Sequence, residues 1–267
     1  MKTLLTAGVL VLALSGPAAS AQAAAPMEIK FGVDATYPPF ESIAPSGKMV
    51  GFDIELASAI CDHLKAKCIF MSQPFSSIIP ALQARKFDAI LSSLNKTAER
   101  EKSIAFSSLM YTLPTGLVAR KQSGLRMTVD SLKGKMVGVE IGSAQEGFAN
   151  AYWKPEGVHV VSYMTQDQVY SDLILGRLDA SLQDSVQADY GFLRTPTGKP
   201  FALVGTMSDD PQHLISAFTG IGMRKDEPEL LAKINEAIAA IHANGTYDRL
   251  QAKYFTINIY QPAAGGH

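Results

Sequence analysis

Polar, charged and aromatic residues follow several of the segments whose hydrophobic pattern predicts β-strands. In the first half of the chain they are Asp34, Tyr37, Phe75, Ser92, Ser93, Asn95 and Arg100, and in the second half Glu140, Ser143, Ala144, Gln145 and Asp184. Ligands of open α/β sheets bind beyond the carboxyl ends of the parallel strands. In such a fold these residues would converge on one site, and together they can bind a zwitterion.

The charges of this set match the two ends of an amino acid. Arg100 offers a planar fork that pairs with a carboxylate, and backbone N–H groups at Ala144 and Gln145, where a helix is expected to start, would assist it. Asp184 could surround an α-ammonium group together with oxygens of Ser93 and Asn95, because an ammonium has donors only.

The aromatic members and one more acid would meet the ligand's side chain. Tyr37 and Phe75 have flat faces that can sandwich an aliphatic stem or a delocalised cation, and Asp34 remains to meet a distal positive charge. Each assignment has a structural alternative. Asp34 could cap a turn, Phe75 could belong to the core, Arg100 could lie in a solvated charge run at 97–102, and the two serines could simply end a strand.

Alternating strands and helices would position these residues, which predicts parallel sheets covered by helices. Strands are expected at 28–33, 68–71, 88–91, 136–139, 158–163, 179–182 and 220–224. Helices are expected from 53, at 76–85, 144–150, 166–175 and 227–243, and from 247. Asp53 is the expected N-cap of the first helix.

An internal repeat predicts two similar α/β lobes. Residues 82–91 and 173–182 share a helix end, a basic turn and a strand start at Asp88 and Asp179, to which we assign structural roles. The tripeptides Gly32-Val33-Asp34 and Gly138-Val139-Glu140 end matching strands. We expect lobe one at 27–112 and 217–260, lobe two at 116–208 and a tail at 261–267. Two extended crossings, near 111–116 and 208–217, would form a hinge.

The N-terminus has the layout of a secretory signal peptide. A basic start at Lys2 precedes an uncharged apolar run at 4–14 and small residues at 19–21. The run is shorter than the roughly 20 residues of a transmembrane helix. We expect a signal peptide at 1–21, cleaved after residue 21 or 23, and an exported, soluble mature chain. In an oxidising compartment Cys61 and Cys68 can form a disulfide; the alternative is two unrelated buried thiols.

The composition excludes several classes of protein. The 267 residues include 24 Lys and Arg against 25 Asp and Glu, so a partner bound through its phosphates, such as nucleic acid, is not expected. The hydrophobic content of 47% supplies a core and argues against disorder. No cofactor or metal is predicted, because Gly220-Ile221-Gly222 lacks a third glycine and the five histidines have no zinc-ligand spacing.

From about residue 28 to 260 the sequence resembles the polar amino-acid-binding proteins of bacterial ABC importers, most closely the periplasmic lysine/arginine/ornithine- and histidine-binding proteins. The resemblance rests on motifs at 33–40, 51–56, 88–100, 132–146 and 176–184. It implies the type II periplasmic binding protein fold, with a discontinuous lobe one. Cys61 and Cys68 lie where those proteins form a disulfide.

The resemblance also implies roles for the site residues, and they agree with those assigned from the residues alone. Asp34 would recognise a side-chain cation, with Ser92 as a further polar contact and Gln145 lining lobe two. Tyr37 and Phe75 would sandwich the ligand's stem. The family places Ser93 and Asp184 at the α-ammonium, and Arg100 with the backbone of Asn95 and Ala144 at the α-carboxylate.

Three positions depart from those relatives: Asn95 replaces Ser, Ala144 replaces Thr and Glu140 replaces Leu. Glu140 matches Asp34 in the repeat, so it could add a second acid near the distal end of a long cation such as arginine. It could equally turn to solvent at the rim of the cleft. An affinity series for basic amino acids in Glu140→Leu would decide between these alternatives.

The resulting expectation is a periplasmic, monomeric receptor that closes on arginine, lysine, ornithine or histidine and delivers it to an ABC permease. Which of these is preferred, and whether opines bind, is left open. Dehydratases acting on prephenate or arogenate share the fold and are the enzymatic alternative. A sensor feeding a membrane kinase or chemoreceptor is a third possibility.

Overall fold

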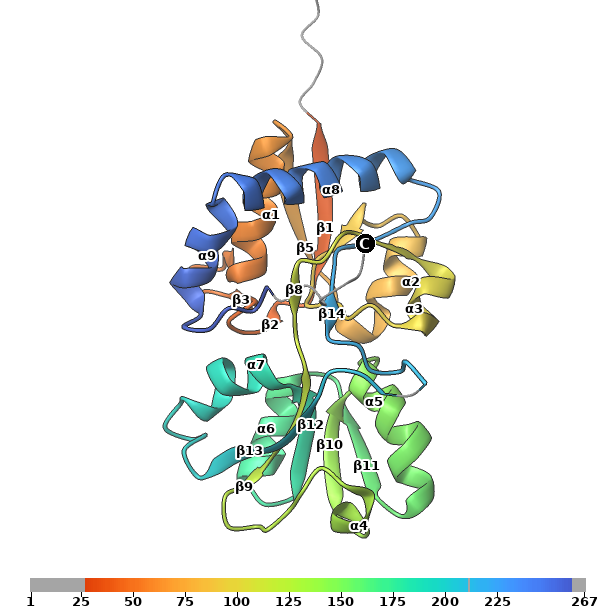
Figure 1. Cartoon of the computed structure of the whole chain (residues 1–267), viewed down its shortest axis with the longest axis vertical. Coiled ribbons are helices and arrows are strands. Elements are labelled where there is room, and N and C mark those ends of the chain that lie inside the picture. The colour runs from red at the N-terminus through yellow and green to blue at the C-terminus, as the bar shows by residue number, and fades with distance from the viewer. Residues whose placement is uncertain (1–26, 211, 261–267) are drawn as a thin grey trace, which may run out of the picture.

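Two α/β lobes make up the part of the chain that the structure describes, which is residues 27–210 and 212–260 of a computed structural model (Figure 1). The expected signal peptide at 1–21 and the tail at 261–267 lie outside these residues. No helix in the described ranges is both long and apolar enough to cross a membrane.

Each lobe contains a five-stranded sheet of the same topology. In lobe one the order is β5-β1-β6-β15-β7, from Lys67–Ser72, Glu28–Val33, Ala89–Ile90, Gly222–Met223 and Ala105–Phe106. In lobe two the order is β11-β10-β12-β9-β13, from His159–Tyr163, Met136–Glu140, Ala180–Asp184, Thr115–Arg120 and Phe201–Met207. In both sheets only the fourth strand, β15 or β9, runs antiparallel to its neighbours. The predicted α/β class with mainly parallel sheets is confirmed.

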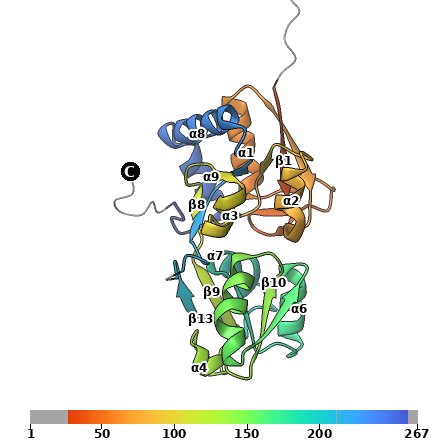
Figure 2. The same cartoon turned by 90° about the vertical axis from the view of Figure 1, so that its right-hand side faces the viewer.

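Helices flank these sheets in both views (Figures 1 and 2). Lobe one carries α1 Phe52–His63, α2 Ile78–Gln83, α3 Ala98–Ser103, α8 Pro228–Ala243 and α9 Thr246–Tyr254. Lobe two carries α4 Val129–Leu132, α5 Ala144–Phe148, α6 Gln166–Ile174 and α7 Ser185–Gln187. Short 3-10 helices at Phe75–Ser77 and Lys154–Glu156 and π-helical segments at Ala149–Trp153 and Ala188–Leu193 extend them, and β2 Thr36–Tyr37, β3 Glu41–Ile43 and β4 Met49–Val50 form a small sheet.

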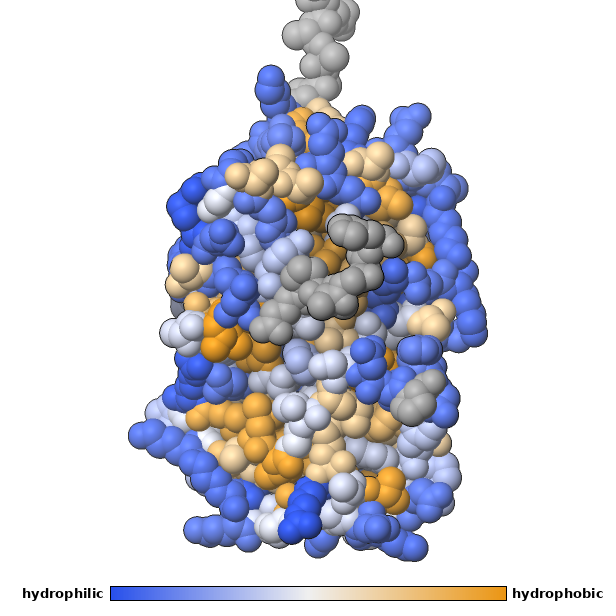
Figure 3. Space-filling model, viewed as in Figure 1, coloured by the Kyte–Doolittle hydropathy of each residue, from blue (hydrophilic) through white to orange (hydrophobic). Residues whose placement is uncertain are grey.

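Strand alternation sends side chains to a separate apolar cluster on each face of each sheet. In lobe one, Phe31 and Val33 of β1 pack on the side of α1, α8 and α9, while Ile90 of β6 joins the cluster of α2. In lobe two, Val137 and Val139 of β10 pack with residues of α5. A second cluster there surrounds α6. Figure 3 shows polar side chains along the outer edges and apolar ones gathered over β13 and β9.

The repeated aspartates have the structural role expected for them. Asp88 accepts a hydrogen bond from the backbone N–H of Lys30 at 2.9 Å, and Asp179 accepts one from Met136 at 2.8 Å. Each therefore joins the start of the third strand of its sheet to the neighbouring second strand, β1 or β10. The repeat reflects one local design used twice.

Two chain segments connect the lobes side by side. Their strands β8 Tyr111–Thr112 and β14 Phe218–Thr219 pair antiparallel, close to the expected crossings. The chain then returns to lobe one, where α8 and α9 pack against α1. This arrangement supplies the short two-stranded link that a hinge requires.

Some local predictions were wrong. Asp53 does not cap α1: Gly51 is the N-cap, and Asp53 lies buried in the first turn, where it accepts from the Tyr111 hydroxyl at 2.6 Å. The expected helix at 76–85 is a 3-10 turn followed by the six residues of α2.

The predicted disulfide is confirmed: it joins Cys61, in α1, to Cys68, in β5.

Candidate functional site

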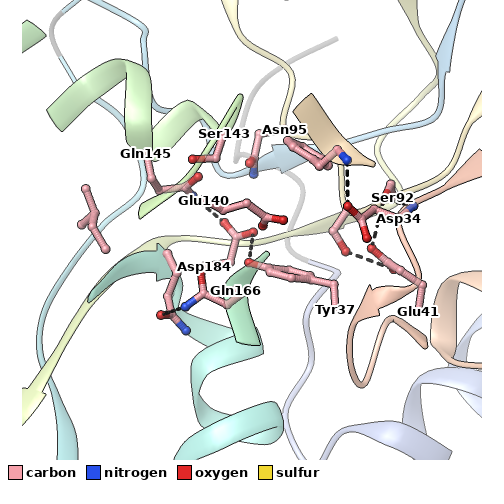
Figure 4. A pocket seen from close by; sticks show the side chains of 14 residues that line it. Asp34, Tyr37, Glu41, Ser92, Asn95, Glu140, Ser143, Gln145, Gln166 and Asp184 are labelled. Atoms are coloured by element: carbon pink, nitrogen blue, oxygen red, sulfur yellow. Dashed lines mark hydrogen bonds between the residues drawn. The ribbon is translucent and has the colours of Figure 1, made fainter. Parts of the chain in front are cut away.

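A pocket lies where the carboxyl ends of the parallel strands of the two lobes face each other (Figure 4). Ten of the twelve predicted ligand-binding residues line it: Asp34, Tyr37, Phe75, Ser92, Ser93, Asn95, Glu140, Ser143, Gln145 and Asp184. The fold thus brings together residues that are up to 150 positions apart in the chain. The other two, Arg100 and Ala144, are not among the lining residues.

Asp34, just after β1, is held in place by lobe one itself. Its carboxylate accepts hydrogen bonds from the Thr36 hydroxyl at 2.7 Å and from the backbone N–H of Phe75 at 2.7 Å. Its own N–H donates to Ser92 at 2.9 Å. Burial raises the pKa of Asp34, and the two donors oppose that rise. The carboxylate is therefore both a turn-forming group and a wall of the pocket.

Asp184, the last residue of β12, collects donors from both lobes. Tyr37 donates to it from lobe one at 3.0 Å, and the side-chain amide of Gln145 donates from lobe two at 2.9 Å. Burial raises the pKa of Asp184 to about 7, against the effect of these donors and of the positive charge of Arg100. The predicted role of Tyr37 concerned only its ring, whereas its hydroxyl also links the lobes.

Glu140, the last residue of β10, points into the pocket rather than to solvent (Figure 4). Its exposed fraction is 8%, so the rim alternative is wrong. Burial raises its pKa well above the usual value, and the charges of Asp34, Asp184 and Asp167 add to the rise. No donor among the described residues makes a hydrogen bond to its carboxylate.

Arg100 lies buried beside the pocket, not in a solvated charge run. Its guanidinium donates to the carbonyl of Asn95 at 2.8 Å and, across to lobe two, to the carbonyl of Gly142 at 3.0 Å. It also lies over the Phe75 ring, 5.4 Å from the centroid. Burial lowers its pKa to about 10, which leaves the group cationic at neutral pH. Two carbonyls occupy only part of its five-donor fork.

Ala144 is the first residue of α5, as predicted, and Ser143 is its N-cap. The Ser143 hydroxyl accepts from the backbone N–H of Glu146 at 3.0 Å, and the Gly142 N–H donates to the Glu146 carboxylate at 2.7 Å. These bonds fix the turn that carries the start of the helix. Ala144 itself is buried next to the lining residues Ser143 and Gln145.

Four lining residues were not predicted: Glu41, Gln166, Leu182 and Gln183. Leu182 and Gln183 precede Asp184 on β12, and Gln166 is the first residue of α6 and donates to Gln183. The repeat contained a signal for two of them, because Gln166 corresponds to Phe75 and Gln183 to Ser92. Extending the repeat beyond its ten matched residues would have identified both.

Glu41 has no such signal, because it comes from the small sheet at the edge of lobe one. It is completely buried beside Asp53, and both Ser92 and Ser93 approach it with hydroxyl oxygens at 3.4 Å. Burial raises the pKa of Glu41 well above its usual value, and the neighbouring Asp53 charge raises it further. This acid supports the two serines from behind.

The side chain of Asn95, at the top of the pocket in Figure 4, lies close enough to Asp184 to lower the pKa of that carboxyl group. Within residues 27–210 and 212–260, its side-chain Nδ2 has no hydrogen-bond acceptor and is buried. Buried amide donors are almost always paired, either with protein or with a bound molecule. Asn95 therefore adds a donor to the acids and hydroxyls of the pocket.

A family model describing the bacterial extracellular solute-binding proteins, family 3, matches residues 29–257. The chain belongs to this family. It is 46% identical to the lysine/arginine/ornithine-binding periplasmic protein of Escherichia coli K12, over 97% of this chain and 99% of that protein. It is 45% identical, with the same coverage, to the histidine-binding periplasmic protein of that strain.

A solved structure has the same fold. An ancestral arginine-binding protein bound to arginine superimposes with a TM-score of 0.79 and 34% identity, over 85% of this chain and 98% of that one. The two Escherichia coli relatives are periplasmic binding proteins, and the family is described as extracellular. Membership of the family therefore implies a solute-binding protein that acts outside the cytoplasm.

Proposed function

We propose that this solute-binding protein captures a cationic L-amino acid, arginine, lysine, ornithine or histidine, and delivers it to an ABC permease in the membrane. One observation carries the proposal: the pocket gathers the carboxylates of Asp34, Glu140 and Asp184, with Arg100 as the cation beside it. An acidic pocket with one arginine complements a ligand that has two positive groups and one negative group. Lysine, arginine and ornithine, the ligands named for one relative, have this charge pattern, and histidine, named for the other, acquires it when its imidazole is protonated.

Each end of the ligand has partners in this proposal. The free N–H groups of Arg100, with the backbone at Asn95 and Ala144, bind the α-carboxylate. Asp184 and Ser93 receive the α-ammonium. The rings of Tyr37 and Phe75 enclose the stem, and Asp34 with Ser92 meets the side-chain cation, while Ser143 and Gln145 complete the wall.

Closure of the two lobes completes the site. The lobes comprise 27–112 with 217–260, and 116–208, and β8 with β14 is the hinge. Bonds from Tyr37 to Asp184 and from Arg100 to the Gly142 carbonyl already join the lobes next to the pocket. A ligand favours the closed state only through contacts that are better there, and a site shared by two lobes provides them. The chain is secreted by its signal peptide, acts in the periplasm and is monomeric.

Titration calorimetry on refolded protein, freed of co-purified ligand, tests the proposal. Basic amino acids should bind, and glutamate and alanine should not. Arg100→Ala should weaken binding by about 2–5 kcal/mol, because it leaves the ligand carboxylate unpaired. Exposed Arg126→Ala is the control. If no basic amino acid binds, or if Arg100→Ala binds as tightly as the parent, the proposal fails. Turnover of prephenate or arogenate would instead indicate an enzyme.

A further inference from the structure

The most unusual group in the pocket is Glu140, because it is an almost completely buried acid without a donor. Its side chain is 8% exposed and lines the pocket, and no hydrogen bond from the described part of the chain reaches its carboxylate. A buried carboxylate in such a position is costly unless a cation or a donor joins it. The site therefore lacks a positive group at Glu140 that a ligand can supply.

Glu140 and Asp34 hold equivalent positions in the two lobes and face one pocket (Figure 4). Asp34 is placed by the Thr36 hydroxyl and the Phe75 N–H, so its remaining lone pairs are oriented before a ligand binds. Glu140 approaches from the opposite lobe. A cation between them would be held by one carboxylate from each lobe.

The shape of such a cation follows from its donors. A guanidinium is flat and carries five N–H groups in a rigid fork, so it can donate to two carboxylates on different sides at once. An ammonium is a compact point charge with three donors and cannot reach as far. Two acids that approach from different lobes therefore fit a guanidinium better than an ammonium.

We propose that Glu140 is a specificity-determining residue that, together with Asp34, grips the guanidinium of an arginine-like ligand. The inference deepens the proposed function and rests on it. It predicts that arginine binds more tightly than lysine or ornithine. It also predicts that much of this preference resides in one side chain.

Binding should also release a proton. The groups that face Glu140 are the acids Asp34 and Asp184, Asp167 at the start of α6, and the Tyr37 hydroxyl. Arg100, next to Asp184, is the cation on the far side of the site. Burial and these acids raise the pKa of Glu140 in the free protein, so a larger share of it is protonated there than when a cation lies beside it. When the guanidinium arrives, the carboxyl O–H bond breaks, the proton passes to solvent, and the carboxylate pairs with the cation.

Calorimetry with arginine, lysine and citrulline on the parent protein and on Glu140→Gln tests both parts. Citrulline has the shape of arginine without the charge. In Glu140→Gln we expect arginine affinity to fall at least about tenfold, lysine affinity to fall less, and citrulline affinity to stay within about threefold. Repeating the titrations in buffers with different ionisation enthalpies should show fewer protons released by the variant than by the parent.

Matched variants separate this idea from other failures. Glu140→Asp keeps the charge but shortens the side chain, and should lie between the parent and Glu140→Gln. Glu156→Gln, an exposed acid of lobe two, should change nothing. An unchanged ratio of arginine to lysine affinity in both Glu140 variants would overturn the inference and leave the proposed function intact. Failure of the parent to bind any basic amino acid would overturn the proposed function itself.

Discussion

The two lobes build their halves of the pocket from equivalent positions but fill them with different chemistry. Four lining positions of lobe one have lining counterparts in lobe two: Asp34 and Glu140, Phe75 and Gln166, Ser92 and Gln183, Ser93 and Asp184. Lobe one contributes one acid, two hydroxyls and a ring, whereas lobe two contributes two acids and two amides. A duplicated scaffold has kept its pocket positions while the side chains changed.

The first pair shows what the difference means physically. Asp34 accepts two hydrogen bonds from its own lobe, so its charge is stabilised before any ligand arrives. Glu140 has no donor and faces further acids, so its charge depends on a partner from outside. The lobe-one half of the pocket, with Asp34, can thus carry its negative charge without a ligand. In the lobe-two half, the charge of Glu140 becomes favourable only when a cation binds next to it.

The two lobes also stabilise equivalent helix-to-strand turns in different ways: the turn between α1 and β5 in lobe one, and the turn that precedes β11 in lobe two. In lobe one the N–H of Ala66 donates to the carbonyl of Cys61 at 2.9 Å, and in lobe two the N–H of Val158 donates to Trp153 at 3.1 Å. The backbone turn is the same. Lobe one closes it with the disulfide from Cys61, whereas lobe two buries Trp153, which is 3% exposed, in an apolar cluster.

The largest expected effects come from breaking these two connections. Trp153→Ala should lower the free energy of unfolding by about 3–5 kcal/mol, because it leaves a large cavity in lobe two. The double variant Cys61→Ser, Cys68→Ser should lower it by about 2–3 kcal/mol, because the disulfide closes only a short loop. Urea denaturation followed by far-UV circular dichroism measures both.

The single tryptophan of the chain provides the control. Because Trp153 lies in lobe two, its fluorescence reports that lobe while dichroism reports both. In the double cysteine variant, dichroism should shift to lower urea at least as far as fluorescence does. If the fluorescence transition moved further than the dichroism transition, the disulfide would not act mainly by stabilising lobe one.

The acids of lobe two should make the ligand-free protein less stable as the pH rises above 6.5. Burial raises the pKa of Asp184 to about 7 and that of Glu140 well above its usual value, so the folded state keeps protons that the unfolded state has released. Stability present at lower pH is therefore lost as the pH rises through the folded pKa values. Between pH 6.5 and 8 we expect a loss of about 1–2 kcal/mol in urea titrations.

Below pH 6.5, other groups also change the stability of the protein as they titrate. Burial lowers the pKa of His242 from 6.5, which makes stability rise with pH below that value, and Asp53 titrates at about 6. The slope above pH 6.5 should flatten in Glu140→Gln and when arginine is present. A slope that is equally steep in that variant would assign the effect to Asp184 or to acids of lobe one such as Glu41, and not to Glu140.

Neutralising the two equivalent acids should have opposite effects on the ligand-free protein. Asp34→Asn removes a charged acceptor from Thr36 and from the Phe75 N–H, and should lower stability by about 1–2 kcal/mol. Glu140→Gln removes an unpaired buried charge and should raise stability by about 1 kcal/mol at pH 8. Thermal denaturation at pH 8 compares the two variants with the parent. Changes in melting temperature of the same sign would contradict the proposed difference between Asp34 and Glu140.

Much of the site could be predicted because the residues that build it follow strands of the repeated pattern. Asp34, Glu140 and Asp184 come at strand ends, where the topology of parallel sheets brings side chains together. The same logic applied to the counterparts of Phe75 and Ser92 would have identified Gln166 and Gln183. Both residues lie outside the matched segment at 173–182, and neither has the residue type of its counterpart in lobe one.

Other features depend on tertiary contacts that no local pattern encodes. Glu41 reaches the pocket from an edge hairpin that has no counterpart in lobe two. Asp53 is predicted to cap a helix, but its carboxylate instead accepts a hydrogen bond from the hydroxyl of Tyr111, in the crossing strand β8. Arg100 is predicted to bind the ligand, but its local sequence does not show that carbonyls of both lobes hold its guanidinium. Each case is decided by residues far away in the sequence.

The smallest expected effect tests the repeat at its turn. Gly176, with φ at 75°, and Arg85, with φ at 57°, hold the same left-handed position before the strands that begin with Asp-Ala. A Cβ added at Gly176 meets no atom within 4 Å, so Gly176→Arg should cost only the backbone strain of about 1 kcal/mol. Arg85→Gly relieves that strain but loses its bonds to Asp226 and Glu227, so its net change should be smaller. If urea denaturation showed Gly176→Arg to be as stable as the parent, the positive φ at residue 176 would impose no cost on an arginine. The glycine would then not be explained by the backbone conformation of this turn.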